Sequence, residues 1–437
     1  MSWARLVHFL RAERAEARWL DVVVALVACG VLAWLAASVP HARFVDFVSF
    51  SQRAEGLRRG EHWMHPLYPV GYPLLLSGLQ ALFGDVLVAG RVISVAAGVG
   101  LSVALSRWTS PWLALVVLVQ VPVLTYGATE GTDLMAAALA ISAVLAGVRG
   151  RSWLAGALLG GACMCRYTGI AAAPIVLWLA GWRGLVGFGL ATAPHWLGAA
   201  VLGVSPWPDQ SLNMRIGQGP GGGPAAGPVE RFFVGLWQVS HSLKTWPALA
   251  GVVGLIVGVW RRDKRAIYLL LYGLLHCAGL ALAFGNPRLA LPVLVVMGCG
   301  WFWLLPRRWL VLALPVLLWW GWPRAREIPG DAVLVAEVQE AAQGMEGPYA
   351  SSTAWFYSEQ GGWLRAPWAI WEAAQPGVLT PEKLHIWCKK VGIRMVVLDR
   401  ARTRRAPGIQ GLSMGKKTEG FELVAKGKGW VLLRVLP

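Results

Sequence analysis

Long apolar blocks are the feature of this sequence that most restricts its fold. Most run for about 15–23 residues, and short breaks containing Arg, Pro or Gly separate them. A helix of about 20 apolar residues is long enough to cross the ~30 Å hydrocarbon core of a bilayer. Only 14% of the residues are charged, whereas a soluble domain averages about 25%. The sequence therefore predicts a polytopic membrane protein and excludes soluble enzymes and disordered chains.

Eleven such blocks predict an all-α membrane domain of about eleven transmembrane helices. The first block, residues 19–37, is longer than the apolar part of a cleavable signal peptide, which spans about 7–15 residues. It is therefore predicted to be retained as the first helix. The other ten blocks lie near residues 86–105, 111–127, 133–148, 153–165, 169–181, 184–204, 246–260, 266–284, 289–305 and 309–322.

Basic residues predict how these helices are oriented. If every block crosses once, the loops on the N-terminal side carry 14 Lys or Arg residues in 37 positions, whereas the loops on the other side carry 9 in 98. The positive-inside rule then places the N-terminus in the cytoplasm and the C-terminus outside a bacterial cytoplasmic (inner) membrane. The net charge of +17 is accounted for by this orientation, so no nucleic-acid partner is predicted.

The composition changes toward the C-terminus. Residues 324–437 hold 11 of the 23 acidic residues, and their apolar runs are short. The Thr-Pro-Glu sequence at 380–382 is typical of a helix start, residues 393–398 form a buried-strand pattern, and residues 420–436 indicate two strands around a Gly-Lys-Gly turn. We expect a transmembrane domain over 1–323, followed by a small extracytoplasmic α/β domain.

Acidic residues are few before residue 324, and the predicted topology sorts them. Asp46 shares a predicted helical face with Ser49 and Arg53 among aromatic and β-branched residues. A carboxylate in such surroundings is costly unless it is paired or used. The alternative is an interfacial helix whose first-turn Asp complements the helix dipole. Eight acids lie near the predicted outer face: Asp46, Glu55, Glu61, Asp85, Glu130, Asp133, Asp209 and Glu230.

Other charged residues on the same side are candidates for completing a polar site. Glu130 and Asp133 lie at the predicted start of a helix, where Thr132 and Asp133 would equally serve as an ordinary N-cap and first-turn acid. Arg166 and Arg288 lie at predicted outer helix ends. Arginine suits bidentate binding of phosphate, and the alternative is that both side chains snorkel to the interface.

The segment Glu-His-Trp-Met-His-Pro-Leu-Tyr-Pro at 61–69 holds candidate substrate or metal contacts, namely Glu61, His62, His65 and Tyr68. Sets of His and Glu suit a divalent ion. Such residues at a membrane surface are also common as interfacial amphipathic groups without a ligand. A divalent cation is therefore left open, the metal is unknown, and the sequence identifies no other cofactor.

Together these features resemble the GT-C class of membrane glycosyltransferases. The similarity is greatest to bacterial relatives of the dolichyl-phosphate-mannose protein mannosyltransferases, a group that includes the lipid A aminoarabinose and galacturonic acid transferases. It spans roughly residues 19–300 and rests on the acidic first outer loop around Asp46, the stretch HPLYPVGYP at 65–73 with Phe83-Gly84, Gly131-Thr132-Asp133, and residues 155–174.

The resemblance implies an outer-face enzyme that takes a sugar from a polyprenyl-phosphate donor. It implies that Asp46 acts as general base on the acceptor hydroxyl, with inversion at the anomeric carbon. Glu130 and Asp133 match the second acidic position, and Arg166 and Arg288 would hold the donor phosphate. Many members carry two adjacent acids in the first loop, whereas a phenylalanine follows Asp46 here, so a metal-binding pair is not evident.

The implied partners are the donor lipid, membrane lipid, and a lipid, glycan or protein acceptor. Other functions stay open. A transporter or flippase for a lipid-linked substrate would use the same helices, although acids gathered at one face argue against alternating access. An O-antigen ligase or polymerase would use a late outer loop, and residues 207–244 contain Arg215, Arg231 and His241. A catalytically inactive relative would act through the C-terminal domain.

Overall fold

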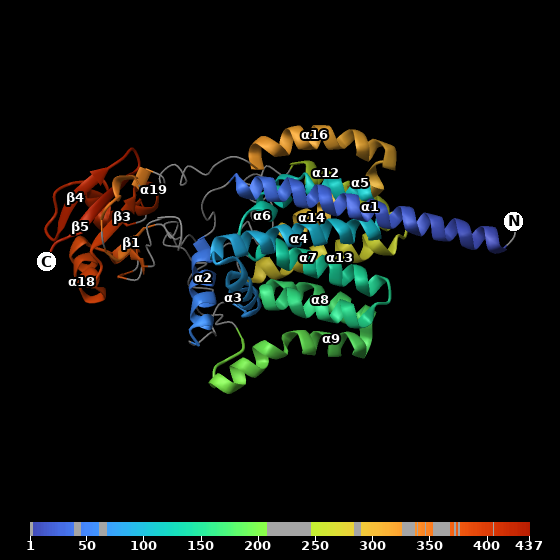
Figure 1. Cartoon of the computed structure of the whole chain (residues 1–437), viewed down its shortest axis with the longest axis horizontal. Helices are drawn as coiled ribbons and strands as arrows, with labels where there is room; N and C mark the ends of the chain where they lie inside the picture. The colour runs from blue at the N-terminus through green and yellow to red at the C-terminus, as the bar shows by residue number, and fades with distance from the viewer. Residues whose placement is uncertain are drawn as a thin grey trace.

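The computed structural model describes residues 3–38, 45–60, 68–207, 246–283 and 290–325, and from residue 337 onward all positions except 339, 346, 353–367, 371–372, 375 and 405. Helices before residue 326 form a bundle, with α2 and α3 at one end (Figure 1). In chain order they are α1 (Trp3–Ala37), α2 (Val45–Arg58), α3 (Gly71–Phe83), α4 (Val86–Trp108), α5 (Pro111–Leu118), α6 (Val121–Ala128), α7 (Asp133–Val148), α8 (Ser152–Cys165), η1 (Tyr167–Ala172), α9 (Ala173–Leu202), α12 (Trp246–Trp260), α13 (Lys264–Ala283), α14 (Leu291–Cys299), α15 (Trp301–Leu304) and α16 (Arg307–Ala325).

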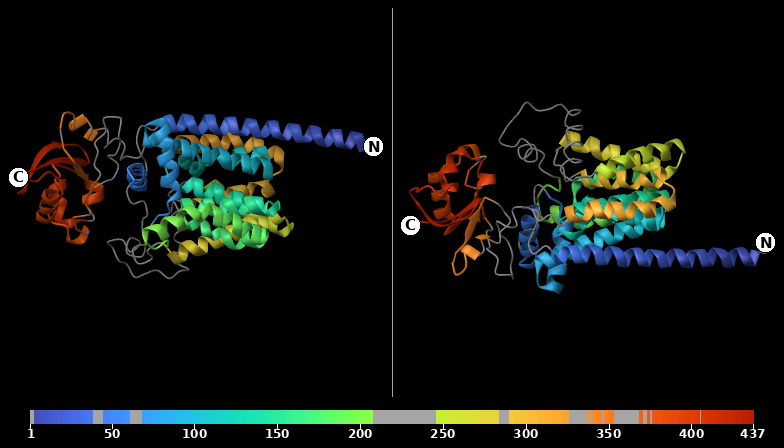
Figure 2. Two further views of the ribbon diagram at one scale, coloured as in Figure 1. Left: turned by 60° about the horizontal axis from the view of Figure 1, so that its bottom comes forward. Right: turned by 90° about the horizontal axis from the view of Figure 1, so that it is seen from above.

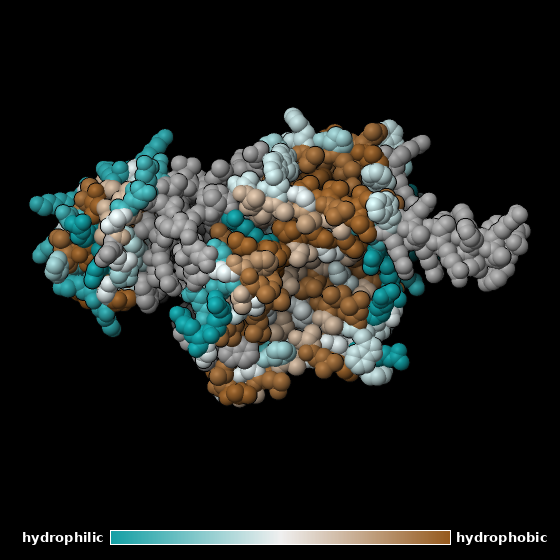
Figure 3. Space-filling model, viewed as in Figure 1, coloured by the Kyte–Doolittle hydropathy of each residue, from teal (hydrophilic) through white to brown (hydrophobic). Residues whose placement is uncertain are grey.

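Several of these helices suit a membrane. Within the described residues, three stretches are long and apolar enough to cross one, namely Trp19–Ala37, Val86–Trp108 and Tyr167–Leu202, and the bent pair α5–α6 would make a fourth. Figure 3 shows hydrophobic side chains over the middle of the bundle and hydrophilic side chains toward its two ends. The total of about eleven crossings stays a prediction, because other apolar helices such as α7 and α8 are shorter.

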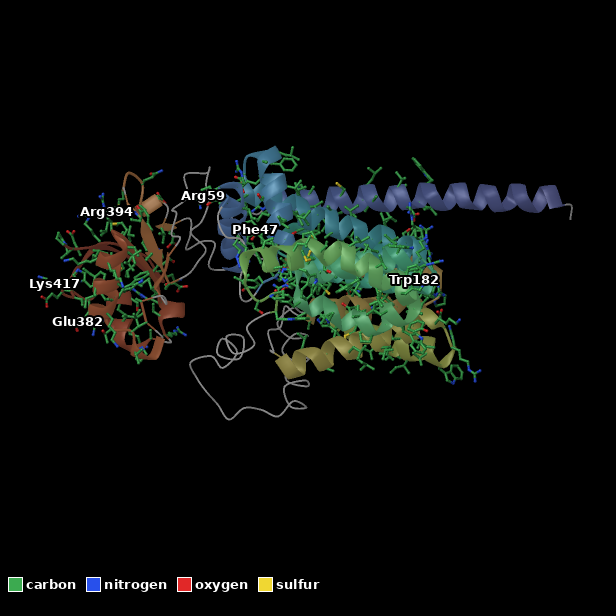
Figure 4. The ribbon with its side chains drawn as sticks, turned by 90° about the horizontal axis from the view of Figure 1, so that it is seen from below. Phe47, Arg59, Trp182, Glu382, Arg394 and Lys417 are labelled. Atoms are coloured by element: carbon green, nitrogen blue, oxygen red, sulfur yellow. The ribbon has the colours of Figure 1, made fainter. Side chains whose placement is uncertain are left out.

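Gly181 divides α9 into two parts. Its φ of 57° lies in the left-handed region that glycine adopts readily. The Tyr167 hydroxyl, just before α9, donates to the Pro206 carbonyl oxygen just after it, across 3.5 Å. The chain therefore turns back at Gly181 and returns to the end of the bundle from which it came. Figure 4 shows Trp182, beside this turn, at the opposite end of the bundle from Phe47 of α2.

The apolar block at 111–127 forms two helices rather than one. Helices α5 and α6 meet at a bend of 74°. Gln120 precedes α6 in extended backbone, and Pro122 lies within the first two positions of α6. Proline fits the first turn of a helix but has no N–H with which to continue a preceding one, so the block breaks here.

The C-terminal residues contain a five-stranded sheet in the order β2–β1–β3–β5–β4. Strand β1 pairs in parallel with β2 and β3, whereas β5 pairs antiparallel with β3 and β4. The predicted helix start at 380–382 is confirmed, because the Lys383 N–H donates to the Thr380 hydroxyl across 3.3 Å. The elements are β1 (Tyr349–Ser351), β2 (Trp368–Ala369), η4 (Pro376–Val378), α18 (Pro381–Val391), β3 (Met395–Asp399), α19 (Arg400–Thr403), η5 (Pro407–Ile409), α20 (Gln410–Ser413), β4 (Phe421–Lys426) and β5 (Trp430–Val435).

The two ends of the chain lie at opposite ends of the molecule. Figures 1 and 2 place the C-terminal sheet beyond the end of the bundle that carries α2, and the start of α1 beyond the other end. The predicted topology requires such a separation of the termini. Which end faces the cytoplasm, and the division into domains at residue 324, stay predictions.

Cysteine labelling should report the orientation. Cys388 is fully buried, and burial raises the pKa of its thiol to about 12, so it should stay unlabelled near neutral pH in either orientation. Lys417 is exposed on the C-terminal part and Trp182 at the opposite end of the bundle (Figure 4). We expect Lys417→Cys to react with an impermeant maleimide in intact spheroplasts, and Trp182→Cys only after permeabilisation. The reverse pattern would contradict the predicted topology, and the wild type measures the background from the native cysteines.

Candidate active site

Helix α2 packs its aromatic side chains onto the end of the bundle. Phe47 and Phe50 are both buried and form a cluster with Tyr72 of α3 and Ile93 of α4. The Phe50 and Tyr72 rings meet edge to face with centroids 5.2 Å apart. Asp46, the predicted general base, adjoins Phe47 and therefore belongs to the first turn of a helix held against the bundle. Its side chain lies outside the described residues.

Gly90 of α4 has no side chain, so both α2 and the segment before α7 can pack closely against α4 at this position. A Cβ on Gly90 would lie 2.6 Å from a ring carbon of Phe47 and 2.9 Å from the Cβ of Glu130. Packed atoms do not approach this closely, so a larger residue would push one of these side chains away. The neighbour of Asp46 and the acid Glu130 thus meet on α4, although they are far apart in the sequence.

Glu130 is fully buried and faces an arginine within α4. Its Oε2 lies 3.9 Å from Nε of Arg91, whose side chain is 15% exposed. A buried carboxylate needs such a cation, because desolvation of an unpaired charge is costly. Arg91 was not among the residues predicted from the sequence. The available signal was an arginine inside the apolar block 86–105, since a charge within such a block is itself a functional-site signal.

Asp133 and Arg166 form a second, closer ion pair. Asp133 Oδ1 lies 2.8 Å from Arg166 Nε, and their side chains are 4% and 11% exposed. Asp133 begins α7, and Arg166 lies in extended backbone between α8 and η1. Thr132 makes no side-chain hydrogen bond to the start of α7. Asp133 is the first-turn acid of α7, as the ordinary alternative predicts, and it has in addition a buried cation as its partner.

Tyr72 of α3 supports the turn between the two acids. The Gly131 N–H donates to the Tyr72 hydroxyl oxygen across 3.0 Å. Gly131 has a φ of 150°, a backbone conformation that favours glycine. Helix α3 thus contributes both to the aromatic cluster under α2 and to the position of the segment from Glu130 to Asp133.

Arg53 of α2 brings a third guanidinium group to this end of the bundle. Its Cζ lies 5.7 Å from the centroid of the Tyr68 ring. Both terminal nitrogens are buried, and within the described residues neither has a hydrogen-bond partner or a carboxylate. Burial lowers the pKa of Arg53 to about 10, so the side chain stays charged at neutral pH. The sequence pattern placed Arg53 on the face of Asp46, but it did not reveal that the guanidinium nitrogens have no partner among the described residues.

Several predicted site residues lie outside the described part of the chain: Glu61, His62, His65 and Arg288. Tyr68 is described, and its ring meets Phe50 edge to face with centroids 4.9 Å apart. Among the residues that the structure describes, no three His, Cys, Asp or Glu side chains gather as a metal site. The divalent-cation hypothesis for residues 61–65 therefore stays a prediction.

Removing one partner of the Asp133–Arg166 pair should destabilise the protein strongly. Arg166→Gln would leave Asp133 as an uncompensated buried charge, which costs about 3–5 kcal/mol. The double variant Asp133→Leu, Arg166→Met should recover most of this loss, since apolar residues of similar size fill the same space. Unfolding of the purified variants in detergent measures the effect. Additive destabilisation in the double variant would contradict a direct pair.

Solved structures resemble this chain over both the helical bundle and the C-terminal part. The structure of ArnT from Cupriavidus metallidurans bound to undecaprenyl phosphate matches with a TM-score of 0.60 and 13% sequence identity, over 94% of this chain and 97% of that one. The apo structure of the same ArnT matches with a TM-score of 0.57 and 13% identity, over 96% and 98%. The chain has the ArnT fold. No protein-family model and no curated protein matches the sequence.

The resemblance to GT-C membrane glycosyltransferases implied a fold of that class, and the structural match with ArnT confirms the fold. The match with ArnT extends over nearly the whole of both chains, so it includes most of the C-terminal part as well as the helical bundle. At 13% identity it establishes architecture, and the roles of individual residues have to be argued from their own geometry.

Proposed function

We propose that this protein transfers a sugar from a polyprenyl-phosphate donor to an acceptor at the end of the bundle that carries α2, and that this end is the outer face. One observation carries the proposal. Two buried acid–arginine pairs lie near α2, and so does Arg53, whose guanidinium has no carboxylate partner within the described residues, in a chain that shares the fold of ArnT bound to undecaprenyl phosphate. ArnT is a lipid A aminoarabinose transferase of the GT-C class.

The proposed reaction is a direct displacement at the anomeric carbon. The acceptor hydroxyl oxygen forms a bond to that carbon while the bond from the carbon to the phosphate oxygen breaks. The electron pair of the broken bond leaves with the polyprenyl phosphate, and the hydroxyl proton passes to the Asp46 carboxylate. Attack from the face opposite the phosphate inverts the configuration. A general base in reach contributes about 10²–10⁴-fold to such a step.

The paired acids have a supporting role in this proposal. Glu130 and Asp133 are bound to Arg91 and Arg166, so they hold guanidinium groups in place and keep their charge balanced before the donor arrives. Arg166, with Arg288, stays our proposed contact to the donor phosphate. Positive charge fixed in advance stabilises the departing phosphate without reorganisation during the reaction.

Arg53 is the further phosphate contact that we propose. Arg91 and Arg166 each have a carboxylate partner, whereas Arg53 has none within the described residues. An uncompensated buried cation is costly, and an arriving phosphate would remove that cost while forming charge-assisted hydrogen bonds. Arg53 lies two turns after Asp46 on the same helix, so one element would carry both the base and an anchor for the leaving group.

A transfer assay with the purified full chain tests the proposal. The protein in lipid vesicles is given a panel of labelled polyprenyl-phosphate hexoses and pentoses together with a membrane extract as acceptor source. We expect one donor to be consumed, with release of free polyprenyl phosphate and label in the acceptor fraction. Movement of intact donor across the bilayer without consumption would instead support the transporter alternative and overturn the proposal.

A further inference from the structure

A groove of 740 Å³ lies along the bundle, and it extends from the apolar cluster under α2 toward the opposite end of the bundle. It is lined by residues of α3, α4, α7 and α8, whose outer surface is largely hydrophobic in Figure 3. Along α4 the lining extends from Val92 to Arg107, which at 1.5 Å per residue corresponds to ~22 Å of helix. The groove is therefore long enough for an acyl chain that lies parallel to the helices.

The two ends of this groove differ in polarity. Toward α2 the lining is apolar and includes Leu75 and Leu79 of α3. At the opposite end it includes three arginine side chains, Arg107, Arg149 and Arg151. A molecule that fits both ends has a long apolar part and one anionic head, with the head at the end remote from α2.

Among the residues that the structure describes, the arginine end carries more positive charge than its carboxylate partner neutralises. Arg107 pairs with Asp21, Nε to Oδ2, at 2.7 Å, and Arg149 donates to the backbone carbonyl oxygen of Arg107. Within the described residues, Asp21 is the only carboxylate paired with this cluster, and Arg151 has no ion-pair partner. Burial, followed by the charges of Arg151 and Arg107, lowers the pKa of Arg149, so the three guanidinium groups lie within electrostatic range of one another.

We propose that this groove binds an anionic phospholipid of the leaflet opposite α2, with its phosphate on Arg149 and Arg151 and an acyl chain along α4 and α7. Arginine binds phosphate through two parallel hydrogen bonds. Basic pockets between membrane helices select anionic over zwitterionic headgroups for the same reason. The groove supplies both requirements, an apolar channel and an excess of arginine at one end.

The polarity of the groove argues against the sugar donor as its occupant. The phosphate of a donor has to reach the end of the bundle that carries α2, where Asp46 and the acid–arginine pairs lie. The groove residues at that end include Val92, Ile93 and Met135 and offer no cation. A lipid whose phosphate sits on Arg149 and Arg151 therefore has the opposite orientation from the donor.

The arginine contribution is tested by lipid binding to the purified full chain. Native mass spectrometry measures retention of phosphatidylglycerol and of phosphatidylcholine with identical acyl chains. We expect the wild type to prefer phosphatidylglycerol, and the double variant Arg149→Gln, Arg151→Gln to lose about 10–30-fold in its affinity for that lipid. The matched control is Arg183→Gln, Arg262→Gln, which removes two exposed arginines outside the groove and should change the affinity by less than about twofold.

The apolar contribution is tested by filling the groove. Gly100 lines it, and a Cβ at this position would meet no atom within 4 Å, so Gly100→Leu occupies the space of the acyl chain without a clash in the protein. The matched control is Gly189→Leu on α9, where the surroundings are equally open but lie outside the groove. We expect only Gly100→Leu to lower phosphatidylglycerol retention, with both variants as thermostable as the wild type.

Three outcomes would overturn the proposal. They are equal retention of the two phospholipids by the wild type, equal loss in the arginine variant and its control, and unchanged binding in Gly100→Leu. Displacement of phosphatidylglycerol by polyprenyl phosphate, dependent on Arg149 and Arg151, would identify the groove as a donor site instead. None of these measurements depends on sugar transfer, so they stand apart from the proposed function.

Discussion

Asp46→Asn should lower sugar transfer by about 10²-fold or more while the protein stays folded. Asparagine keeps the size and polarity of the side chain but cannot accept the acceptor proton. The loss should appear in kcat with little change in the donor KM, because the proposed base acts on the acceptor hydroxyl rather than on the donor phosphate. Initial rates with a labelled polyprenyl-phosphate sugar measure both quantities.

Asp85→Asn is the matched control for Asp46→Asn. Asp85 lies at the same end of the bundle and caps α4, where it accepts hydrogen bonds from the backbone of Leu87 and Val88. Asparagine caps a helix about as well as aspartate, so Asp85→Asn should lose only the charge contribution at the helix N-terminus, about 0.3–1 kcal/mol, and leave transfer intact. If Asp46 is only a first-turn acid of α2, Asp46→Asn should behave in the same way, with about 0.3–1 kcal/mol lost. Full activity of Asp46→Asn would remove the general-base proposal.

Arg53→Gln should raise the donor KM by about 10–150-fold, the loss expected for one charge-assisted contact to phosphate of about 1.5–3 kcal/mol. It should not lower the stability of the free protein. The two terminal nitrogens of Arg53 are buried and have no carboxylate partner within the described residues, so its removal relieves a desolvation cost. This combination of weaker donor binding and unchanged or higher stability distinguishes Arg53 from Arg166, whose loss leaves Asp133 unpaired.

Arg58→Gln is the control for Arg53→Gln, because Arg58 lies on the same helix but is exposed. Its removal should change neither the donor KM nor the thermal stability by a measurable amount. Equal effects of the two variants would mean that α2 acts through its overall charge and would contradict a specific contact by Arg53. A normal donor KM in Arg53→Gln, with Asp46→Asn still inactive, would reject the phosphate contact while keeping the proposed reaction.

The outline of the membrane part follows from the sequence because hydrophobic length and breaker residues act locally. The apolar stretches at 19–37 and 86–105 reappear as helices, and the break near 182 reappears as the turn at Gly181. The bend between α5 and α6 was not anticipated, since a block of unbroken hydrophobicity hides the effect of Pro122. In the C-terminal part, the capped helix after Thr380 and the hairpin of β4 and β5 were predictable from short-range signals.

The partners of the charged side chains were not predictable in this way. Topology alone placed Glu130, Asp133 and Arg166 on one side of the bundle, but it did not show that Asp133 and Arg166 lie 2.8 Å apart. Arg91 was not predicted as a site residue, because it is a single charge inside an apolar block. Arg53 lay on the expected helical face, yet only the surrounding side chains reveal that it has no counter-charge within the described residues.

By itself, the sequence determined that this chain forms a helical membrane protein, which residues occupy its long helices, and which acids are candidates for chemistry at one end. These properties depend on periodicity, length and charge bias along the chain, all of which are local. Only the tertiary structure decided which charge faces which, and that the arginine end of the groove lies at the end of the bundle remote from these acids. Such pairings join segments that are distant in the sequence, and they depend on close packing at positions such as Gly90, where a single Cβ would separate α2 from Glu130.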